Sequence, residues 1–357
     1  LLVILGAACL IFKIKHSIMY RDTSNIKLTH RDASESLCGT LRHKLVIIFA
    51  YERTGSTFLG DIFNNDKEVF YFYEPFRPKH SKWPYPRELD TFERYKYVSN
   101  IIGHVMRCEL DKFPKDLPIM QDGYLAIKSA NIRRIAECYS KKENISQCIH
   151  LSRKACNAKT IIVSKTVRST MESIGHLLSK YRKCASKVKV IHLVRDPRGM
   201  LNSRKTSAHL NMDQLTAEAN TLCKRMHKDV LIFKQIKEIF PDSILQLRYE
   251  DLAEHPQETT SNIYRYLQME YTNEINSFVA GRTLNKGAAE NQYGTKRRDS
   301  NATAYAWKKT ISYNLVKSVD PVCYSLYKEL GYLPIQSEKE LRDKALVHRQ
   351  NAPFTSI

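Results

Sequence analysis

The amino-acid sequence predicts an α/β fold, a parallel β-sheet flanked by helices, and two observations support this. Short apolar runs typical of buried strands recur along the chain, at residues 45–50, 69–73, 160–164, 188–194 and 243–249. Segments with helical spacing of apolar residues lie between them, at residues 58–63, 92–110, 171–181 and 213–240. Strands that alternate with helices are typical of a parallel sheet with right-handed crossovers, and no internal repeat is present.

The first expected strand leads into a loop that suits an anion. The loop reads Tyr51-Glu52-Arg53-Thr54-Gly55-Ser56-Thr57, and the helix behind it starts near Phe58. A glycine, two hydroxyl residues and a nearby cation can aim backbone N–H groups and the helix dipole at a phosphate or sulfate. An ordinary turn capped by Ser56 or Thr57 is the alternative. The loop lacks the Gly-Lys-Ser/Thr of a Walker A motif, which disfavours an ATP or GTP hydrolase.

The second expected strand is followed by a proline-rich segment, in which Pro75 is the first of four prolines. Trp83 and Tyr85 in this segment have rings that can stack on a sugar, so it is a candidate sugar-binding loop. An irregular surface loop explains it equally well. Farther on, the polar stretch that holds Cys138, Cys148 and Cys156 is expected to be loop-like.

A second candidate anion site follows the expected strand 188–194. Arg195-Asp196-Pro197-Arg198 begins where this strand ends, and Ser203 and Arg204 come about two helical turns later. Side chains at the C-terminal ends of strands line the ligand crevice of open α/β sheets. We therefore expect both anion sites to face one crevice, as a nucleotide with phosphates at both ends requires.

Composition and charge limit the possible partners. The chain has 357 residues, of which 43% are hydrophobic, enough for one large α/β domain or two small ones. Lys and Arg number 57 against 37 Asp and Glu, a net charge of +20 that suits a polyanion. Nucleic acid is the generic partner for such a charge, but no nucleic-acid recognition motif is present. A nucleotide donor with an acidic glycan fits the charge equally well.

Nine cysteines and two glycosylation sequons, at Asn144 and Asn301, together favour an oxidising secretory lumen. The cysteine spacings match no common zinc pattern, and no metal site is expected. The apolar run at the start of the chain is too short to span a bilayer, and we interpret it as part of a truncated signal-anchor helix. A cleaved signal peptide is the alternative. The expected organisation is anchor 1–16, stem 17–42, catalytic domain 43–337 and polar tail 338–357.

Three motifs in this order resemble a known family. Arg53-Thr54-Gly55-Ser56-Thr57-Phe58 is similar to the 5′-phosphosulfate loop of Golgi carbohydrate sulfotransferases, and Arg195 to Arg198 with Ser203 and Arg204 is similar to their 3′-phosphate motif. Residues 70–75, which end in Glu-Pro, resemble the branch that sulfates the 6-hydroxyl of galactose, N-acetylglucosamine or N-acetylgalactosamine. The resemblance covers roughly residues 44–334.

The resemblance implies a P-loop-like sulfotransferase fold and the donor 3′-phosphoadenosine 5′-phosphosulfate, with no metal. It implies a glycan acceptor and no nucleic acid, on a single-pass type II Golgi membrane protein whose catalytic domain is lumenal. A homodimer is left open. The residues it assigns to the donor are Arg53, Thr54, Gly55, Ser56, Thr57, Phe58, Arg195, Arg198, Ser203, Arg204, Trp307 and Lys308.

A loop near the C-terminus, with Trp307 and Lys308 at its end, corresponds to the family's donor-closing loop. Lys308 stands where relatives usually have Arg, a change that keeps a point charge but loses bidentate geometry. A glycan at Asn301 would obstruct this loop, so we expect that sequon to be empty. Lys165 and Arg168 resemble a family element that holds acidic groups of the acceptor, although a solvated strand end explains them as well. The family also carries Cys at positions 223 and 323, which implies that these two pair, with at least one further bridge from Cys138, Cys148 and Cys156; buried free thiols are the alternative.

Sulfuryl transfer needs a stabilised leaving group and a base for the acceptor hydroxyl. Arg53 is the candidate for the first role and Glu74 for the second. We expect Glu74 to follow a strand beside the phosphosulfate loop and to be partly desolvated, which would raise its pKa. A turn cap, or a pair with an Arg such as Arg77, is the alternative, and His80 and His192 are rival bases. Two other functions remain: a P-loop nucleotide kinase, and a non-catalytic basic protein that binds glycan or nucleic acid.

Overall fold

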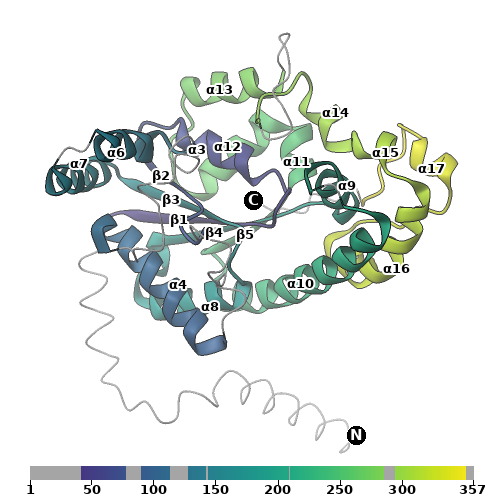
Figure 1. Ribbon diagram of the computed structural model, residues 1–357, viewed down its shortest axis with the longest axis horizontal. Coiled ribbons are helices and arrows are strands. Elements are labelled where there is room, and N and C mark those ends of the chain that lie inside the picture. The colour runs from purple at the N-terminus through teal and green to yellow at the C-terminus, as the bar shows by residue number, and fades with distance from the viewer. Residues whose placement is uncertain are drawn as a thin grey trace, which may run out of the picture. The chain divides into compact units, whose positions relative to one another are not determined.

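The computed structural model describes residues 42–77, 90–112, 128–141, 144–208, 210–284 and 294–350. A sheet of five parallel strands lies at its centre, in the order β2-β3-β1-β4-β5 (Figure 1). This arrangement confirms the predicted fold class. The strands are β1 (Lys44–Phe49), β2 (Val69–Tyr73), β3 (Ile161–Thr166), β4 (Val188–Val194) and β5 (Ile244–Arg248).

Helices cover both faces of the sheet, with α3, α12 and α13 on one face and α4, α8 and α10 on the other (Figure 1). The strands are mostly apolar because both of their faces are buried, and their polar residues, such as Lys165, His192 and Gln246, are buried as well. The helices are α3 (Ser56–Asn64), α4 (Thr91–Met106), η2 (Leu110–Lys112), α6 (Ala130–Ser140), α7 (Ile145–Asn157), α8 (Met171–Lys180), η3 (Arg182–Lys187), α9 (Pro197–Ala208), α10 (Met212–Ile239), α11 (Tyr249–Glu254), α12 (Pro256–Tyr266), α13 (Asn273–Thr283), α14 (Ser300–Tyr305), α15 (Trp307–Thr310), α16 (Tyr313–Leu330) and α17 (Glu338–Arg342).

The strand order corrects one expectation. β2 does not lie next to β1, because β3 pairs with both of them and separates them. Hydrophobic runs predict strands but do not say which strands are neighbours. The outer edge of β2 is covered by side chains instead of a strand: Ser129 Oγ donates to the carbonyl of Tyr71 over 2.5 Å, and Asn131 Nδ2 donates to that of Val69 over 3.2 Å.

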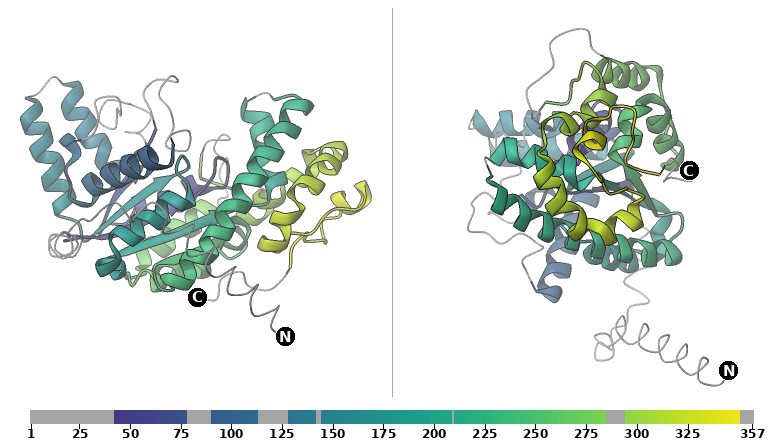
Figure 2. Two further views of the ribbon diagram at one scale, coloured as in Figure 1. Left: turned by 90° about the horizontal axis from the view of Figure 1, so that it is seen from below. Right: turned by 90° about the vertical axis from the view of Figure 1, so that its right-hand side faces the viewer.

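The stretch around Cys138 is also different from the expectation, because it forms the helices α6 and α7 and not a loop. A disulfide joins these helices through Cys138 and Cys148, and a second one joins Cys108 to Cys156. The helix pair lies at one end of the sheet, and α15, α16 and α17 lie at the other (Figures 1 and 2). The crosslinks stabilise a pair of short polar helices whose sequence pattern alone is weak.

The expected pairing of Cys223 with Cys323 is confirmed. Their Cα atoms are 5.2 Å apart, and the disulfide ties α10 to α16. The further bridge expected from the cysteines of α6 and α7 is confirmed as well. The alternative of free thiols is therefore wrong for these residues.

The segment from Glu338 is not a featureless tail up to residue 350. It contains α17, buries Leu341 and His348, and returns to the body where Gln350 N donates to Gly331 O over 2.7 Å. Residues 1–41, Trp83, Tyr85 and His80 lie outside the described residues. None of the helices in the described part of the chain has the length and apolar character that a bilayer crossing requires.

Candidate active site

A cavity of about 530 Å³ opens at the C-terminal edge of the sheet, a size typical of ligand sites. Each strand ends beside it and supplies side chains to its wall. Arg53 follows β1, Glu74 follows β2, Arg168 follows β3, Arg195 follows β4 and Tyr249 follows β5. The crevice that the two motifs predict is therefore present at the edge where open α/β sheets bind ligands.

The loop after β1 reaches the cavity through two unusual backbone conformations. Gly55 has φ +84° and Arg53 has φ +73°, a region that non-glycine residues rarely adopt. Side chains are also excluded at Gly55 by space, since a Cβ there would lie 2.4 Å from the Tyr249 ring. Gly55 is the N-cap of α3, with no side-chain cap, so the alternative of a cap by Ser56 or Thr57 is wrong. The N–H groups of Ser56 and Thr57, at the start of the helix, have no helical acceptor and suit an anion.

Side chains from the two motifs meet directly. Arg53 Nε donates to Ser203 Oγ over 2.8 Å, and an N–H of the Arg195 guanidinium donates to the Arg53 carbonyl over 3.0 Å. The Arg195 guanidinium also lies 4.4 Å from the centre of the Tyr249 ring, which holds it by a cation–π contact. All four residues line the cavity, so the loop after β1 and the segment after β4 form one site.

Glu74 lies at the same edge of the sheet, with φ +48° and 5% exposure. Its carboxylate contacts Lys165 Nζ at 2.5 Å and is also paired with Arg168. The sequence predicts a partly desolvated carboxylate, and the structure adds two cations that favour the charged form. The alternative of a pair with a nearby Arg is therefore borne out, with Arg168 as the partner. The backbone N–H of Arg77 donates to the carbonyl of Glu74.

Lys165 and Arg168 are not a solvated strand end. Lys165 is 2% exposed and lies 4.3 Å from the centre of the Tyr73 ring, while Arg168 also reaches Glu52 at 3.6 Å. Burial lowers the pKa of Arg168, and the nearby Glu52 opposes that shift. The two cations thus pair with Glu74, and both also line the cavity.

Two residues assigned to the donor from the sequence lie away from the cavity. Thr54 is fully buried, and both its N–H and its hydroxyl donate to the carbonyl of Tyr51. Arg204 pairs with Glu218 and donates to the carbonyl of Glu52. Neither lines the cavity. Thr54 stabilises the turn, and Arg204 holds α9 against α10 and the loop.

Arg198 and Lys308 also stand outside the cavity. Arg198 is fully buried and binds Asp196 at 2.8 Å. Lys308 is 6% exposed, and its Nζ donates to the carbonyls of Asp343 at 2.5 Å and Leu346 at 2.7 Å. Burial lowers the pKa of Lys308. Lys308 therefore binds the C-terminal segment and does not line the cavity.

The remaining assigned residues, Ser56, Thr57, Phe58 and Trp307, do line the cavity. The loop expected near the C-terminus, which ends at Trp307 and Lys308, also contributes Gly294, Thr295 and Arg297. Thr295 Oγ1 donates to Asp61 Oδ2 over 2.6 Å, which fastens this stretch to α3.

Sequence reasoning missed Tyr249 and Arg282 as cavity residues. Tyr249 follows the last strand, and its position at a strand end was a usable signal. Arg282 comes from α13, whose sequence has no pattern that points to a ligand. Most charged side chains in the wall are cations: Arg53, Arg77, Lys165, Arg168, Arg195, Arg282 and Arg297. Such a wall favours a polyanionic ligand.

His192 is excluded as a rival base by its surroundings. It is fully buried, and its ring nitrogens contact the Tyr51 hydroxyl at 3.0 Å and Gln246 at 2.8 Å. Burial, with a contribution from Arg225, lowers the pKa of His192 to about 3. This histidine is a neutral hydrogen-bonding group beneath the loop. No cluster of three or more potential metal ligands occurs among the described residues.

Comparison with known proteins gives a consistent picture. Residues 46–273 match the sulfotransferase family. Carbohydrate sulfotransferase 1 of Danio rerio is 25% identical over 347 residues, which cover 84% of this chain and 80% of the relative. Carbohydrate sulfotransferase 2 of Homo sapiens is 25% identical over 363 residues, which cover 85% of this chain and 67% of the relative. The structure of mouse sulfotransferase SULT7A1 complexed with PAP matches with a TM-score of 0.42 and 13% sequence identity. The match covers 84% of this chain and 89% of the mouse chain.

Proposed function

The chain belongs to the sulfotransferase family and is a sulfotransferase, and from this premise we propose that it transfers a sulfuryl group from 3′-phosphoadenosine 5′-phosphosulfate to a carbohydrate 6-hydroxyl. The observation that carries this proposal is the contact between the two anion motifs in one cavity, Arg53 with Ser203 and Arg195 with the Arg53 carbonyl. A nucleotide with an anionic group at each end fits that arrangement.

The donor's two ends take different parts of the wall. The 5′-phosphosulfate lies against the first turn of α3 at Ser56 and Thr57, with Arg53 beside it. The 3′-phosphate binds Arg195 and Ser203, where the planar guanidinium matches phosphate oxygens. Trp307 and Phe58 supply apolar parts of the wall.

The transfer forms one bond and breaks another. The acceptor oxygen attacks sulfur in line, the bond from sulfur to the 5′-phosphate oxygen breaks, and 3′-phosphoadenosine 5′-phosphate leaves. Arg53 stabilises the charge that develops on that oxygen. Glu74 takes the acceptor proton. A carboxylate has about four lone-pair sites, so the contacts with Lys165 and Arg168 leave room for a hydroxyl.

Arg168 helps Glu74 to change charge. When Glu74 becomes protonated, Arg168 still has a carboxylate partner, because Glu52 lies 3.6 Å away. The strained backbone at Glu74 supports a role in the reaction, since such conformations cluster at active sites. The acceptor therefore enters beside Glu74, Arg77 and Arg168.

The acceptor class is galactose, N-acetylglucosamine or N-acetylgalactosamine in a glycan, supported by the names of the relatives and by the Glu-Pro segment after β2. The location is the Golgi lumen, with an anchor at residues 1–16 and a stem at 17–42. The disulfides fit this oxidising compartment.

The test is transfer of radiolabelled sulfate from the donor to keratan, chondroitin and N-acetylglucosamine-terminated acceptors. We expect label on the 6-hydroxyl of at least one of them. Transfer of phosphate from ATP would favour a kinase, and glycan binding without turnover, unaffected by Arg53→Ala, would favour a non-catalytic protein. Either result contradicts the proposal.

A further inference from the structure

A cluster of buried charges lies behind the wall of the cavity, on the side away from the ligand space. At its centre is Arg198, fully buried although it belongs to the motif that the sequence assigns to phosphate. Its guanidinium binds both carboxylate oxygens of Asp196, at 3.0 Å through Nε and at 2.8 Å through a terminal nitrogen. The other terminal nitrogen reaches the Asp320 carboxylate at 3.5 Å and the Leu333 carbonyl at 3.0 Å.

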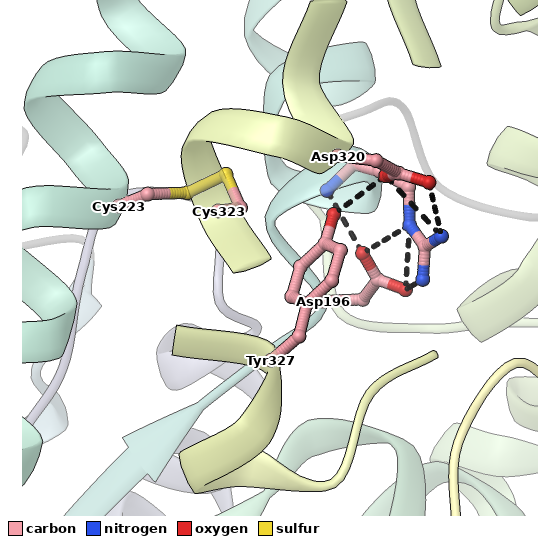
Figure 3. Close-up of a disulfide and its surroundings, with 6 residues drawn as sticks. Asp196, Cys223, Asp320, Cys323 and Tyr327 are labelled. Atoms are coloured by element: carbon pink, nitrogen blue, oxygen red, sulfur yellow. Dashed lines mark hydrogen bonds and ion pairs between the residues drawn. A yellow bond between two sulfur atoms is a disulfide. The ribbon is translucent and has the colours of Figure 1, made fainter. Parts of the chain in front are cut away.

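Figure 3 shows that α16 supplies much of this cluster. Asp320, Cys323 and Tyr327 stand three and four residues apart, which places them on one face of the helix. The Tyr327 hydroxyl donates to Asp320 over 2.9 Å, and the Ile335 N–H donates to the same carboxylate over 2.8 Å. The disulfide from Cys323 to Cys223 then fixes this helix to α10.

The cluster determines where Arg195 points. Asp196 is the next residue, and its carboxylate accepts bonds from both the backbone N–H and the guanidinium of Arg198. Its own N–H donates to Glu250 over 3.1 Å. The backbone at residue 196 is thus held from two sides with its side chain turned inward. The neighbouring Arg195 side chain lies in the wall of the cavity.

The same guanidinium supports Trp307. Arg198 lies 5.3 Å from the centre of the Trp307 ring and 4.9 Å from that of Tyr327. Trp307 packs so closely on Gly199 that a Cβ there would lie 3.0 Å from the indole. Trp307 lines the cavity, whereas Arg198 does not. One buried cation therefore supports two wall residues.

We infer that Arg198 is a positioning residue of the donor site, which never touches the donor but orients Arg195 and Trp307 for the 3′-phosphate end. This inference rests on the proposed function. A fully buried arginine gains its charge compensation from Asp196 and Asp320, so any shift of that pair moves the residues attached to it. Lysine cannot replace it, because an ammonium lacks the planar fork that binds both oxygens of Asp196.

The experiment titrates adenosine 3′,5′-bisphosphate and adenosine 5′-phosphate into the wild-type protein, Arg198→Lys and Tyr327→Phe. Arg198→Lys should weaken bisphosphate binding roughly 3- to 30-fold, the range of coupling through a packed network, with little change for the 5′-phosphate. Tyr327→Phe, which removes one hydroxyl from the cluster, should weaken it in the same direction by a smaller factor. It remains informative if Arg198→Lys does not fold.

Tyr264→Phe is the matched control. The Tyr264 hydroxyl is also buried and donates to a carboxylate, Asp66, over 3.0 Å, but neither residue lines the cavity. Its loss should leave the preference for the bisphosphate intact. Equal preference in Tyr327→Phe, Arg198→Lys and wild type would overturn the inference. A wild-type protein with no preference for the bisphosphate would instead contradict the proposed function.

A spectroscopic measurement separates positioning from general destabilisation. The chain has two tryptophans, so Trp83→Phe leaves Trp307 as the sole fluorescent indole. In this background, Arg198→Lys should shift the emission of the ligand-free protein to longer wavelength, because water gains access to the indole. Tyr264→Phe should not. An unchanged emission in Arg198→Lys would contradict the support that we assign to Arg198.

Discussion

The residues proposed for the two ends of the donor lie side by side in the cavity wall, but they are built differently. At the end that holds Arg53 and Glu74, both residues adopt left-handed backbone conformations, and Glu74 is paired with two cations in the wall. At the end that holds Arg195, the buried Arg198 behind the wall is paired with Asp196 and Asp320. Strained backbone and paired charges are expected where bonds form and break. A network of buried ion pairs is expected where the donor is only bound.

The difference indicates that separate residues of one site serve the transfer reaction and the binding of the donor. Strained backbone persists only where its surroundings over-determine it, and it costs about 1–3 kcal/mol per residue. The reacting end carries that cost at Arg53 and Glu74. Behind the binding end, the Cys223–Cys323 disulfide crosslinks α10 to α16. Substitutions should therefore separate turnover from donor affinity.

Removal of the Cys223–Cys323 disulfide has the largest expected effect. The cysteines are 100 residues apart, and in the loop-entropy account a crosslink of that span adds about 4–5 kcal/mol to the free energy of unfolding. The double variant Cys223→Ala/Cys323→Ala should lose stability of that order in denaturant titration. Cys138→Ala/Cys148→Ala, which opens a crosslink of 10 residues, should lose only about 2–3 kcal/mol. The reverse order would contradict this account of the two crosslinks.

Glu74→Gln comes next. It should lower turnover by roughly 10²-fold or more while donor affinity stays near normal, because the amide cannot accept the acceptor proton. Steady-state kinetics with donor titration measures both quantities, and a melting curve checks the fold. Glu218→Gln is the control, since Glu218 is also paired with an arginine, Arg204, but does not line the cavity. Near-normal turnover in Glu74→Gln, or an equal loss in both variants, would exclude Glu74 as the base.

Arg195→Ala should lower the affinity for the donor. Loss of a charge-assisted contact should weaken donor binding by about 1.5–3 kcal/mol. Affinity for adenosine 5′-phosphosulfate, which lacks the 3′-phosphate, should barely change. Arg204→Ala serves as the control, because Arg204 pairs with Glu218 away from the cavity. Equal losses for both ligands in Arg195→Ala would mean that Arg195 supports the fold and not the phosphate.

Lys308→Met has the smallest expected effect on the donor. The variant removes two hydrogen bonds to the C-terminal segment and should cost about 1–3 kcal/mol of stability. Donor affinity should change much less than in Arg195→Ala, as calorimetric titration of both variants would show. A loss of donor affinity as large as that of Arg195→Ala would restore Lys308 as a phosphate ligand.

The sequence predicted the strands well because apolar runs mark strands buried on both faces, as in 188–194, which matches β4 without a shift. It predicted Arg53, Ser203 and Arg195 at one cavity because strand ends in a parallel sheet share an edge. The order of the strands was missed, since hydrophobicity does not encode neighbours.

Burial of single charged residues was missed as well. Arg198 and Arg195 stand in one motif and look alike in sequence, yet one faces Asp196 and Asp320 and the other faces the cavity. The two cations on Glu74 come from β3 and its following loop, 91 and 94 positions away. Such long-range pairs depend on packing and leave no local pattern.

The central claim is that one nucleotide spans both ends, with Arg53 at the 5′ side and Arg195 at the 3′ side. Calorimetric titration of adenosine 5′-phosphate, adenosine 3′-phosphate and the 3′,5′-bisphosphate into wild type, Arg53→Ala and Arg195→Ala tests it most directly. We predict that Arg53→Ala weakens binding of adenosine 5′-phosphate and that Arg195→Ala weakens binding of adenosine 3′-phosphate. Both variants should weaken binding of the 3′,5′-bisphosphate. Identical effects of the two variants on both monophosphates, or no effect on any ligand, would contradict it.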